Sequence, residues 1–138
     1  MGAEKITLEV VTPEKLVVGE EVDEITAPGY YGYFGVLSHH HPYLTLIGVG
    51  ELMYRIGDKR HYLAVSKGFA EVLGNKVTFL VESCEKPQEI DVSRAEKAKE
   101  RAEARLRAPT PELNVERASA SLQRAFTRLK VEKRKGQA

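Results

Sequence analysis

The sequence predicts an α+β protein in which an N-terminal antiparallel β-sandwich is followed by a C-terminal antiparallel two-helix hairpin. In residues 1–87, β-branched and aromatic residues alternate with polar ones, and glycines interrupt the alternation. This pattern is typical of short strands joined by turns. In residues 88–138, Ala, Glu, Lys, Arg and Leu predominate, and these residues favour helix. We therefore predict two units, one on each side of this change in composition.

The strands of the first unit are predicted from alternation and from turn residues. The dipeptides Gly57-Asp58 and Gly74-Asn75 each separate two alternating runs, which predicts two hairpins with tight turns. The predicted strands lie within residues 6–10, 16–18, 22–27, 52–56, 62–65, 69–73 and 77–81. Many short strands with no helical pattern between them fit a sandwich or a flattened barrel.

The second unit is predicted to contain two helices. Asp91 is a suitable N-cap for the first, whose predicted inner face holds Ala95, Ala98, Ala102 and Leu106. The segment 108–111 (APTP) ends this helix, and Pro111 fits the first turn of the next one. The apolar stripe of the second helix is predicted to contain Val115, Ala118, Leu122, Ala125, Phe126 and Leu129. A short connection favours an antiparallel hairpin. Because an isolated pair of this length is marginally stable in water, it needs a further partner.

Composition and charge limit the functions open to the chain. Its 138 residues are 42% hydrophobic and carry a net charge of +1. Residues 1–90 hold 8 basic and 13 acidic residues (−5), whereas residues 91–138 hold 13 and 7 (+6), so attraction to acidic partners is expected from the C-terminal unit. No apolar run approaches the roughly 20 residues that span a bilayer. The single Cys84 and the absence of a signal-peptide pattern favour the cytosolic side of a membrane.

The sequence offers little evidence for a catalytic site or a metal site. The triplet His39-His40-His41 suggests a metal, but adjacent side chains diverge and no further ligand follows at suitable spacing. A solvated loop before Pro42 is the alternative. Cys84 has no motif around it, and no Walker-type glycine loop is present. The sequence therefore predicts a protein that is not an enzyme and has neither a catalytic residue nor a metal ligand.

The boundary segment and the second helix offer the better candidates for a binding site. Asp91 and Arg94 lie three residues apart at a helix start, so they fit a cap, a hinge or part of an anion or nucleotide site. Arg117, Arg124 and Arg128 share a helix face. That face fits solvent, an acidic protein or phosphate groups. Nucleic acid is disfavoured because the strand region is acidic and has no aromatic-basic motif.

Five segments in the same order resemble the epsilon subunit family of the F-type ATP synthase. They are LEVVTPEKLV (8–17), PGYYGYFGVLSHHHPYLTLIGVG (28–50), AVSKGFAEVLGNKVT (64–78), the I/L-D-x-x-R-A motif at Ile90 to Ala95, and the R-A-x-x-R-L-x-V ending at Arg124 to Val131. The resemblance implies a non-catalytic subunit of the rotor's central stalk, peripheral to the cytoplasmic face of a bacterial membrane. Its sandwich would bind the gamma subunit and the c-ring. Its helical hairpin would either fold onto the sandwich or extend toward acidic segments of the catalytic alpha/beta ring, inhibiting ATP hydrolysis.

The resemblance also implies a regulatory ATP site, with no cofactor required. Its residues would be Glu85, Ile90, Asp91, Arg94, Ala95, Arg124 and Arg128. ATP would stabilise the folded hairpin, with arginines around the phosphates and Glu85 and Asp91 near base or ribose. The alternatives are a coupling subunit without ATP sensing and an ATP sensor whose hairpin never inhibits.

The loop that faces the c-ring in the family differs here. Where relatives carry small and acidic residues, this chain has Tyr30, Tyr31 and Tyr33, and Ser38-His39 replaces the usual Pro-Gly. His40 matches the family histidine. The resemblance therefore implies a c-ring contact formed by these tyrosines and His40, more apolar and aromatic than is usual.

Overall fold

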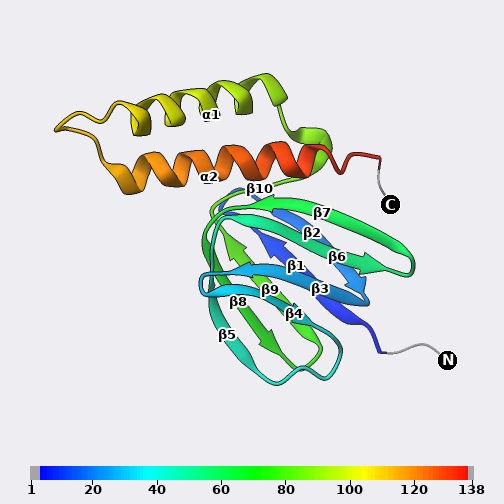
Figure 1. The fold of residues 1–138 in the computed structure, drawn as a ribbon. Coiled ribbons are helices and arrows are strands. Elements are labelled where there is room, and N and C mark those ends of the chain that lie inside the picture. Colours follow the sequence, from blue (N-terminus) through cyan, green and yellow to red (C-terminus); the bar gives the residue numbers. More distant parts are fainter. Residues whose placement is uncertain (1–3, 137–138) are drawn as a thin grey trace.

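A computed structural model describes residues 4–136 of the chain; residues 1–3, with the Met1-Gly2 start, and 137–138 lie outside this range. Strands precede helices along the sequence (Figure 1). The strands are β1 (Ile6–Val11), β2 (Leu16–Val22), β3 (Glu24–Gly29), β4 (Gly32–Val36), β5 (Tyr43–Ile47), β6 (Gly50–Ile56), β7 (Lys59–Val65), β8 (Gly68–Leu73), β9 (Lys76–Val81) and β10 (Cys84–Glu85). A short 3₁₀ turn, η1 (Pro87–Glu89), leads to α1 (Val92–Arg107) and α2 (Val115–Glu132).

The strands form a sandwich, as predicted. Their hydrogen-bonded order is β10-β7-β6-β3-β5-β8-β9-β1-β2, with β4 paired to β3. The link between the two layers is narrow, because β3 meets β5 through the single pair Gly29 and Ile47. All pairs are antiparallel except β1 with β9, which is parallel. A continuous apolar core lies between the layers; its largest fully buried side chains include Phe79, Ile6, Leu8, Ile25 and Leu52.

Alternation identified the strands that bury one face. In β1, Ile6, Leu8 and Val10 are buried and the intervening residues are not. The two predicted hairpins are present as β6–β7 and β8–β9, and Gly57 and Gly74 adopt positive φ in their turns. The sequence pattern missed β4 and β5. Both strands bury only their last residue, so they lack the regular burial on which the prediction depended.

The helix starts are fixed by side-chain caps. Asp91 caps α1, because its Oδ1 accepts a hydrogen bond from the Arg94 backbone N–H at 3.1 Å. The prediction that α2 begins around Pro111 is wrong. A turn closed by the Leu113 N–H and the Thr110 carbonyl precedes the helix, and Asn114 caps it by accepting from the Arg117 N–H at 3.0 Å.

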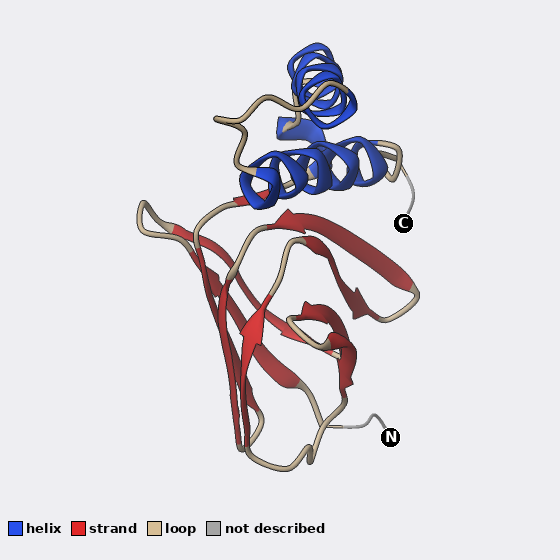
Figure 2. Cartoon of the chain, turned by 60° about the vertical axis from the view of Figure 1, so that its left-hand side comes forward, coloured by secondary structure: helices blue, strands red, loops and turns tan. Residues whose placement is uncertain are grey.

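The hairpin lies across one end of the sandwich with α2 between α1 and the strands (Figures 1 and 2). Consequently α2 has two contacting faces. Ala118 and Ala125, from the predicted stripe, are buried, but so are Thr127 and Val131 outside it. The prediction that Val115 and Phe126 lie in the buried stripe is wrong, because these side chains are 56% and 47% exposed. Val131 packs with Ala64 and Ile90 in a small second core that joins the two units.

Candidate functional site

Of the seven residues predicted to bind ATP, three, namely Glu85, Arg124 and Arg128, line one cavity between hairpin and sandwich. Arg128 donates from Nε to Oε1 of Glu85 at 2.6 Å. Arg124 lines the same small cavity and donates from Nη2 to Ser121 Oγ at 3.1 Å. Ser66, Ser83 and Thr127 add hydroxyl groups to the lining. These groups form a polar site between β10 and α2 with two arginines and one carboxylate.

The other four predicted residues have structural roles or face solvent. Asp91 caps α1. Ile90 is buried with Val131, and Ala95 is 2% exposed inside the hairpin. The Arg94 side chain is exposed, and within residues 4–136 it has neither a hydrogen bond nor an ion pair. The resulting arrangement provides a solvated cation, Arg94, a cation held by the sandwich, Arg128, and a third, Arg124, whose guanidinium donates to Ser121 of its own helix.

Two other groups considered from the sequence, Cys84 and the histidine triplet, lie in environments that do not favour catalysis or metal binding. Burial raises the pKa of the Cys84 thiol to about 12, and the nearby Glu89 acts in the same direction. A thiol with this pKa is a poor nucleophile at neutral pH. His39 Nε2 lies 3.5 Å from Glu4 Oε2, whereas His40 Nδ1 contacts the His41 carbonyl at 2.7 Å. Across the described range, no group of three His, Cys, Asp or Glu side chains is arranged to hold a metal.

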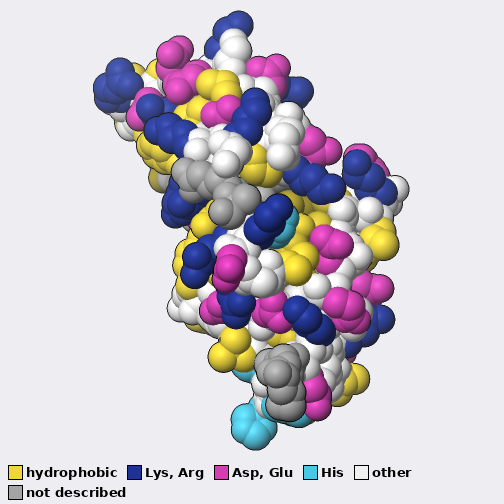
Figure 3. Space-filling model, turned by 90° about the vertical axis from the view of Figure 1, so that its right-hand side faces the viewer, with side chains coloured by type: hydrophobic (Ala, Val, Ile, Leu, Met, Phe, Trp, Pro, Cys, Tyr) yellow, Lys and Arg dark blue, Asp and Glu magenta, His cyan; other side chains and the backbone are white. Residues whose placement is uncertain are grey.

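The tyrosines and His40 occupy opposite ends of the sandwich. Tyr30 and Tyr31 form the turn between β3 and β4, with their rings edge to face at 5.0 Å, and are 65% and 89% exposed. Tyr33, also exposed, accepts a hydrogen bond from the Glu51 N–H at 3.1 Å. His40 follows β4, and the centre of its ring lies 5.9 Å from the centre of the Tyr43 ring. In Figure 3, most of the visible histidine surface lies at the end far from the helices. The structure therefore does not bring the predicted c-ring residues into one patch.

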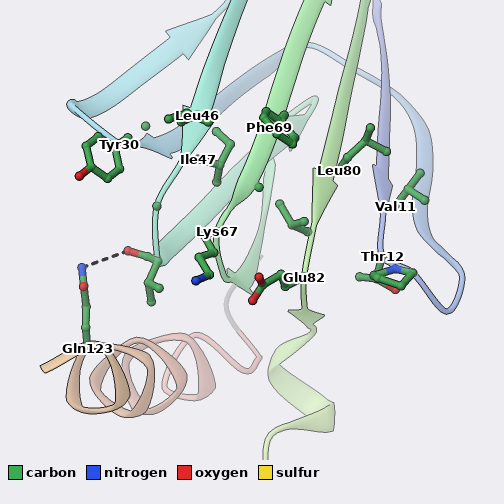
Figure 4. A pocket seen from close by; sticks show the side chains of 16 residues that line it. Val11, Thr12, Tyr30, Leu46, Ile47, Lys67, Phe69, Leu80, Glu82 and Gln123 are labelled. Carbon is green, nitrogen blue, oxygen red and sulfur yellow. Dashed lines mark hydrogen bonds between the residues drawn. The ribbon is translucent and has the colours of Figure 1, made fainter. Parts of the chain in front are cut away.

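A shallow apolar groove of about 940 Å³ crosses the outer face of β5, β8, β9 and β1. Leu46, Phe69 and Leu80 form its floor, and each is about half exposed. Lys67 and Glu82 lie along the edge that faces the hairpin, and Gln123 of α2 closes that edge by donating to the Val49 carbonyl at 3.3 Å (Figure 4). Three neighbouring half-exposed apolar side chains on one sheet face indicate a binding surface.

Sequence reasoning missed a second polar contact between the units. Glu51 on β6 accepts from Arg134 Nε at 3.0 Å and from Nη2 at 3.1 Å. The Arg134 Cζ lies 4.4 Å from the centre of the Tyr62 ring, and Lys130 Nζ lies 3.8 Å from Glu51 Oε1. We call Glu51, Tyr62, Lys130 and Arg134 the Glu51 cluster. Glu51 and Arg134 are 83 residues apart in sequence, so no local pattern could reveal their contact.

Fold and site together define a protein of two parts, a β-sandwich that carries a docked helical hairpin and polar contacts across the junction. Two family models match these parts: the beta-sandwich domain of the ATP synthase delta/epsilon chain over residues 5–87, and its long alpha-helix domain over residues 88–133. The chain belongs to the ATP synthase delta/epsilon chain family.

Individual relatives agree with this assignment. The ATP synthase epsilon chain of Syntrophobacter fumaroxidans is 54% identical over 129 residues, covering 94% of this chain and 96% of the relative. The epsilon chain of Nitratidesulfovibrio vulgaris is 51% identical over 124 residues, covering 90% and 92%. A chain in the Euglena gracilis mitochondrial ATP synthase shares the fold, with a TM-score of 0.81, 24% identity, and coverage of 93% of this chain and 81% of that one. Across residues 4–136, no helix combines the length and apolar character that a membrane span requires.

Proposed function

We propose that this chain is a non-catalytic rotor subunit that couples the gamma subunit to the c-ring and restrains ATP hydrolysis through its C-terminal helices. The observation that carries this proposal is the small, largely polar junction between hairpin and sandwich in a chain of the delta/epsilon family. One buried apolar side chain of α2, Val131, enters the second core, and the hairpin is also held by hydrogen bonds, by ion pairs and by the approach of Arg134 to the Tyr62 ring. Such a junction favours a hairpin that can leave the sandwich.

The surfaces of the sandwich suggest where its partners bind. We assign the groove around Leu46, Phe69 and Leu80 to the gamma subunit, because it is a large apolar surface that the hairpin leaves open. The exposed Tyr30-Tyr31 turn is assigned to the c-ring, as the resemblance implies. His40, at the other end of the sandwich, would then contact the c-ring only through a separate surface. The complex would hold the chain at the cytoplasmic face of a bacterial membrane.

The released hairpin carries the charge needed for its proposed inhibitory contact. Residues 91–138 have a net charge of +6, which attracts acidic segments such as those expected on the alpha/beta ring. In the docked state, part of this charge is neutralised by the sandwich, since Arg128 pairs with Glu85 and Arg134 pairs with Glu51. Undocking would free both arginines for a new acidic partner.

ATP is proposed to hold the hairpin in the docked state by adding its phosphates to Arg124 and Arg128. Arg128 already donates to Glu85, so phosphate must compete with this carboxylate or share the arginine with it. This contact favours the alternative candidate function, a coupling subunit that docks its hairpin without sensing ATP.

The size of the proposed ATP effect follows from mass action. If ATP binds only the docked state, ATP at 100 times its Kd would stabilise that state by about 2.7 kcal/mol.

Deletion of residues 88–138 tests the inhibitory role. We expect ATP hydrolysis by the reassembled ATP synthase to rise several-fold, because the basic helices can no longer reach the catalytic ring. The measurement is the steady-state hydrolysis rate with full-length and truncated chains, at equal occupancy of the complex. An unchanged rate with the truncated chain bound would refute inhibition and leave the coupling role.

Titration of the isolated protein with ATP tests the nucleotide site. We expect Arg128→Gln to weaken binding about tenfold, because a charge-assisted hydrogen bond to phosphate is lost. Arg117→Gln is the matched control, since Arg117 is exposed near the start of the same helix, and its Kd should stay unchanged. Calorimetry measures both. If the wild-type chain shows no saturable heat at millimolar ATP, or if both variants bind like wild type, the site is wrong.

A further inference from the structure

The Glu51 cluster holds the hairpin on the sandwich at a place separate from the proposed nucleotide site. The Glu85–Arg128 pair joins β10 to α2. The Glu51–Arg134 pair joins β6 to the residues just beyond the C-terminal end of α2. None of the four cluster residues belongs to the set assigned to ATP. Two separate charged contacts therefore connect α2 and the residues that follow it to two different strands, in addition to the Gln123–Val49 hydrogen bond.

Glu51 is a buried carboxylate that depends on the docked hairpin for its partners. Its side chain is only 9% exposed, and an ionised carboxylate is costly to bury unless cations and donors surround it. Both cations that approach it, Lys130 and Arg134, come from the C-terminal segment. On its own strand, Glu51 faces outward, since the next residue, Leu52, points into the sandwich core. Undocking would return Glu51 to water and would separate every charge pair of the cluster.

The geometry of the contact is specific rather than merely attractive. The guanidinium uses Nε and Nη2 to reach the two carboxylate oxygens, and its Cζ lies over the Tyr62 ring. The two parallel hydrogen bonds fix the position and the plane of the guanidinium, and the ring adds a cation–π attraction. Behind the carboxylate, the Glu51 N–H is held by the Tyr33 hydroxyl. The hydrogen bonds to Glu51 also raise the pKa of the Arg134 guanidinium above its ordinary value.

We propose that the Glu51 cluster is a latch that holds the helical hairpin on the sandwich without nucleotide. It rests on the proposed function in one respect, that the hairpin can undock. The latch sets the docked population of the free chain, and ATP bound near Arg128 would add to that population rather than create it. Arg134 is therefore the residue that must be released before the basic C-terminal segment can bind an acidic partner.

Single-molecule energy transfer in the isolated full-length protein, without nucleotide, tests the latch. The labels are placed on cysteines introduced by Asp58→Cys in the β6–β7 turn and Thr110→Cys between the helices, in a Cys84→Ser background; Asp58 and Thr110 are both exposed. We expect Glu51→Gln and Arg134→Gln each to raise the undocked fraction about tenfold, as loss of a partly buried ion pair predicts. Because the two residues form one pair, the double variant should undock little more than either single variant.

Glu9→Gln is the matched control, because Glu9 pairs with Lys76 at 3.3 Å within the sandwich and away from the hairpin. This variant should leave the undocked fraction unchanged. Urea unfolding of each variant shows whether the sandwich is intact. Wild-type docking in both latch variants would overturn the latch, as would a double variant whose effect equals the product of the single effects. These outcomes are independent of hydrolysis: truncation could abolish inhibition while the docking data refute the latch, or the reverse.

Discussion

Replacing Val131 by aspartate is expected to undock the hairpin in most molecules while the sandwich stays folded. Val131 is fully buried and packs with Ala64 and Ile90 in the small core that joins the two units. A carboxylate at this position would have to be buried beside apolar side chains, at a cost of about 3 kcal/mol or more. A shift of this size changes the ratio of docked to undocked molecules more than a hundredfold. Energy transfer between labels at positions 58 and 110 measures that ratio directly.

The matched control for this prediction is Val115→Asp. It makes the same chemical change on the same helix, but Val115 is 56% exposed, so the docked fraction should remain that of the wild type. In the reassembled enzyme, Val131→Asp should inhibit hydrolysis more strongly than Val115→Asp, because more hairpins are available to the catalytic ring. Equal docking in the two variants would show that the second core does not hold the hairpin.

The fold could be predicted from the sequence where one local interaction decides the structure. Asp91 predicted the start of α1 because a short acceptor side chain caps a helix within three residues of itself. Gly57 and Gly74 predicted hairpins because the turns need positive φ. The parallel pairing of β1 with β9 could not be predicted in this way, since it joins residues about 70 positions apart. Its basis is the shared core, to which Leu8 and Phe79 both contribute.

The candidate site could be predicted only in part, for the same physical reason. Helical spacing placed Arg124 and Arg128 on one face, and the structure directs both toward the sandwich. The prediction of a single apolar stripe assumed that α2 buries one face. Because α2 lies between α1 and the strands, it buries two faces. For that reason Val131 was not in the predicted stripe, and the Glu51 cluster was not predicted at all. Contacts that depend on docking one unit against another leave no periodic signal.

The Glu85–Arg128 pair, the Glu51–Arg134 pair and the second core respond differently to solution conditions and ligands. Salt does not screen the apolar contact of Val131, whereas the pairs formed by Glu85 and Glu51 weaken as ionic strength rises. Only the Glu85–Arg128 pair lies where phosphate is proposed to bind. A nucleotide therefore acts on one docking contact among several, and it can shift the docking equilibrium only by its differential affinity for the docked state. The remaining contacts set the equilibrium on which it acts.

The second large effect is expected in the sandwich itself, from Gly68→Ala. A Cβ at this position would overlap the Leu80 carbonyl oxygen and would lie 2.7 Å from the Val81 Cα. Both obstacles are backbone atoms of β9, to which β8 is hydrogen-bonded, so neither can move without separating the strands. We expect a loss of about 3 kcal/mol or more in the free energy of unfolding, the upper range for overpacking. Urea unfolding of the isolated protein measures this loss.

Gly35→Ala separates this steric cause from a general intolerance of alanine in place of glycine. Gly35 lies in β4 and has an ordinary φ, and a Cβ added there would meet its nearest neighbours, the Ile25 carbonyl and the Thr26 methyl, at 3.8 and 3.9 Å. Alanine also reduces the freedom of the unfolded chain, so the unfolding midpoint should stay the same or rise slightly. Similar losses in both variants would mean that the close approach of β8 to β9 at Gly68 is not what excludes a side chain there.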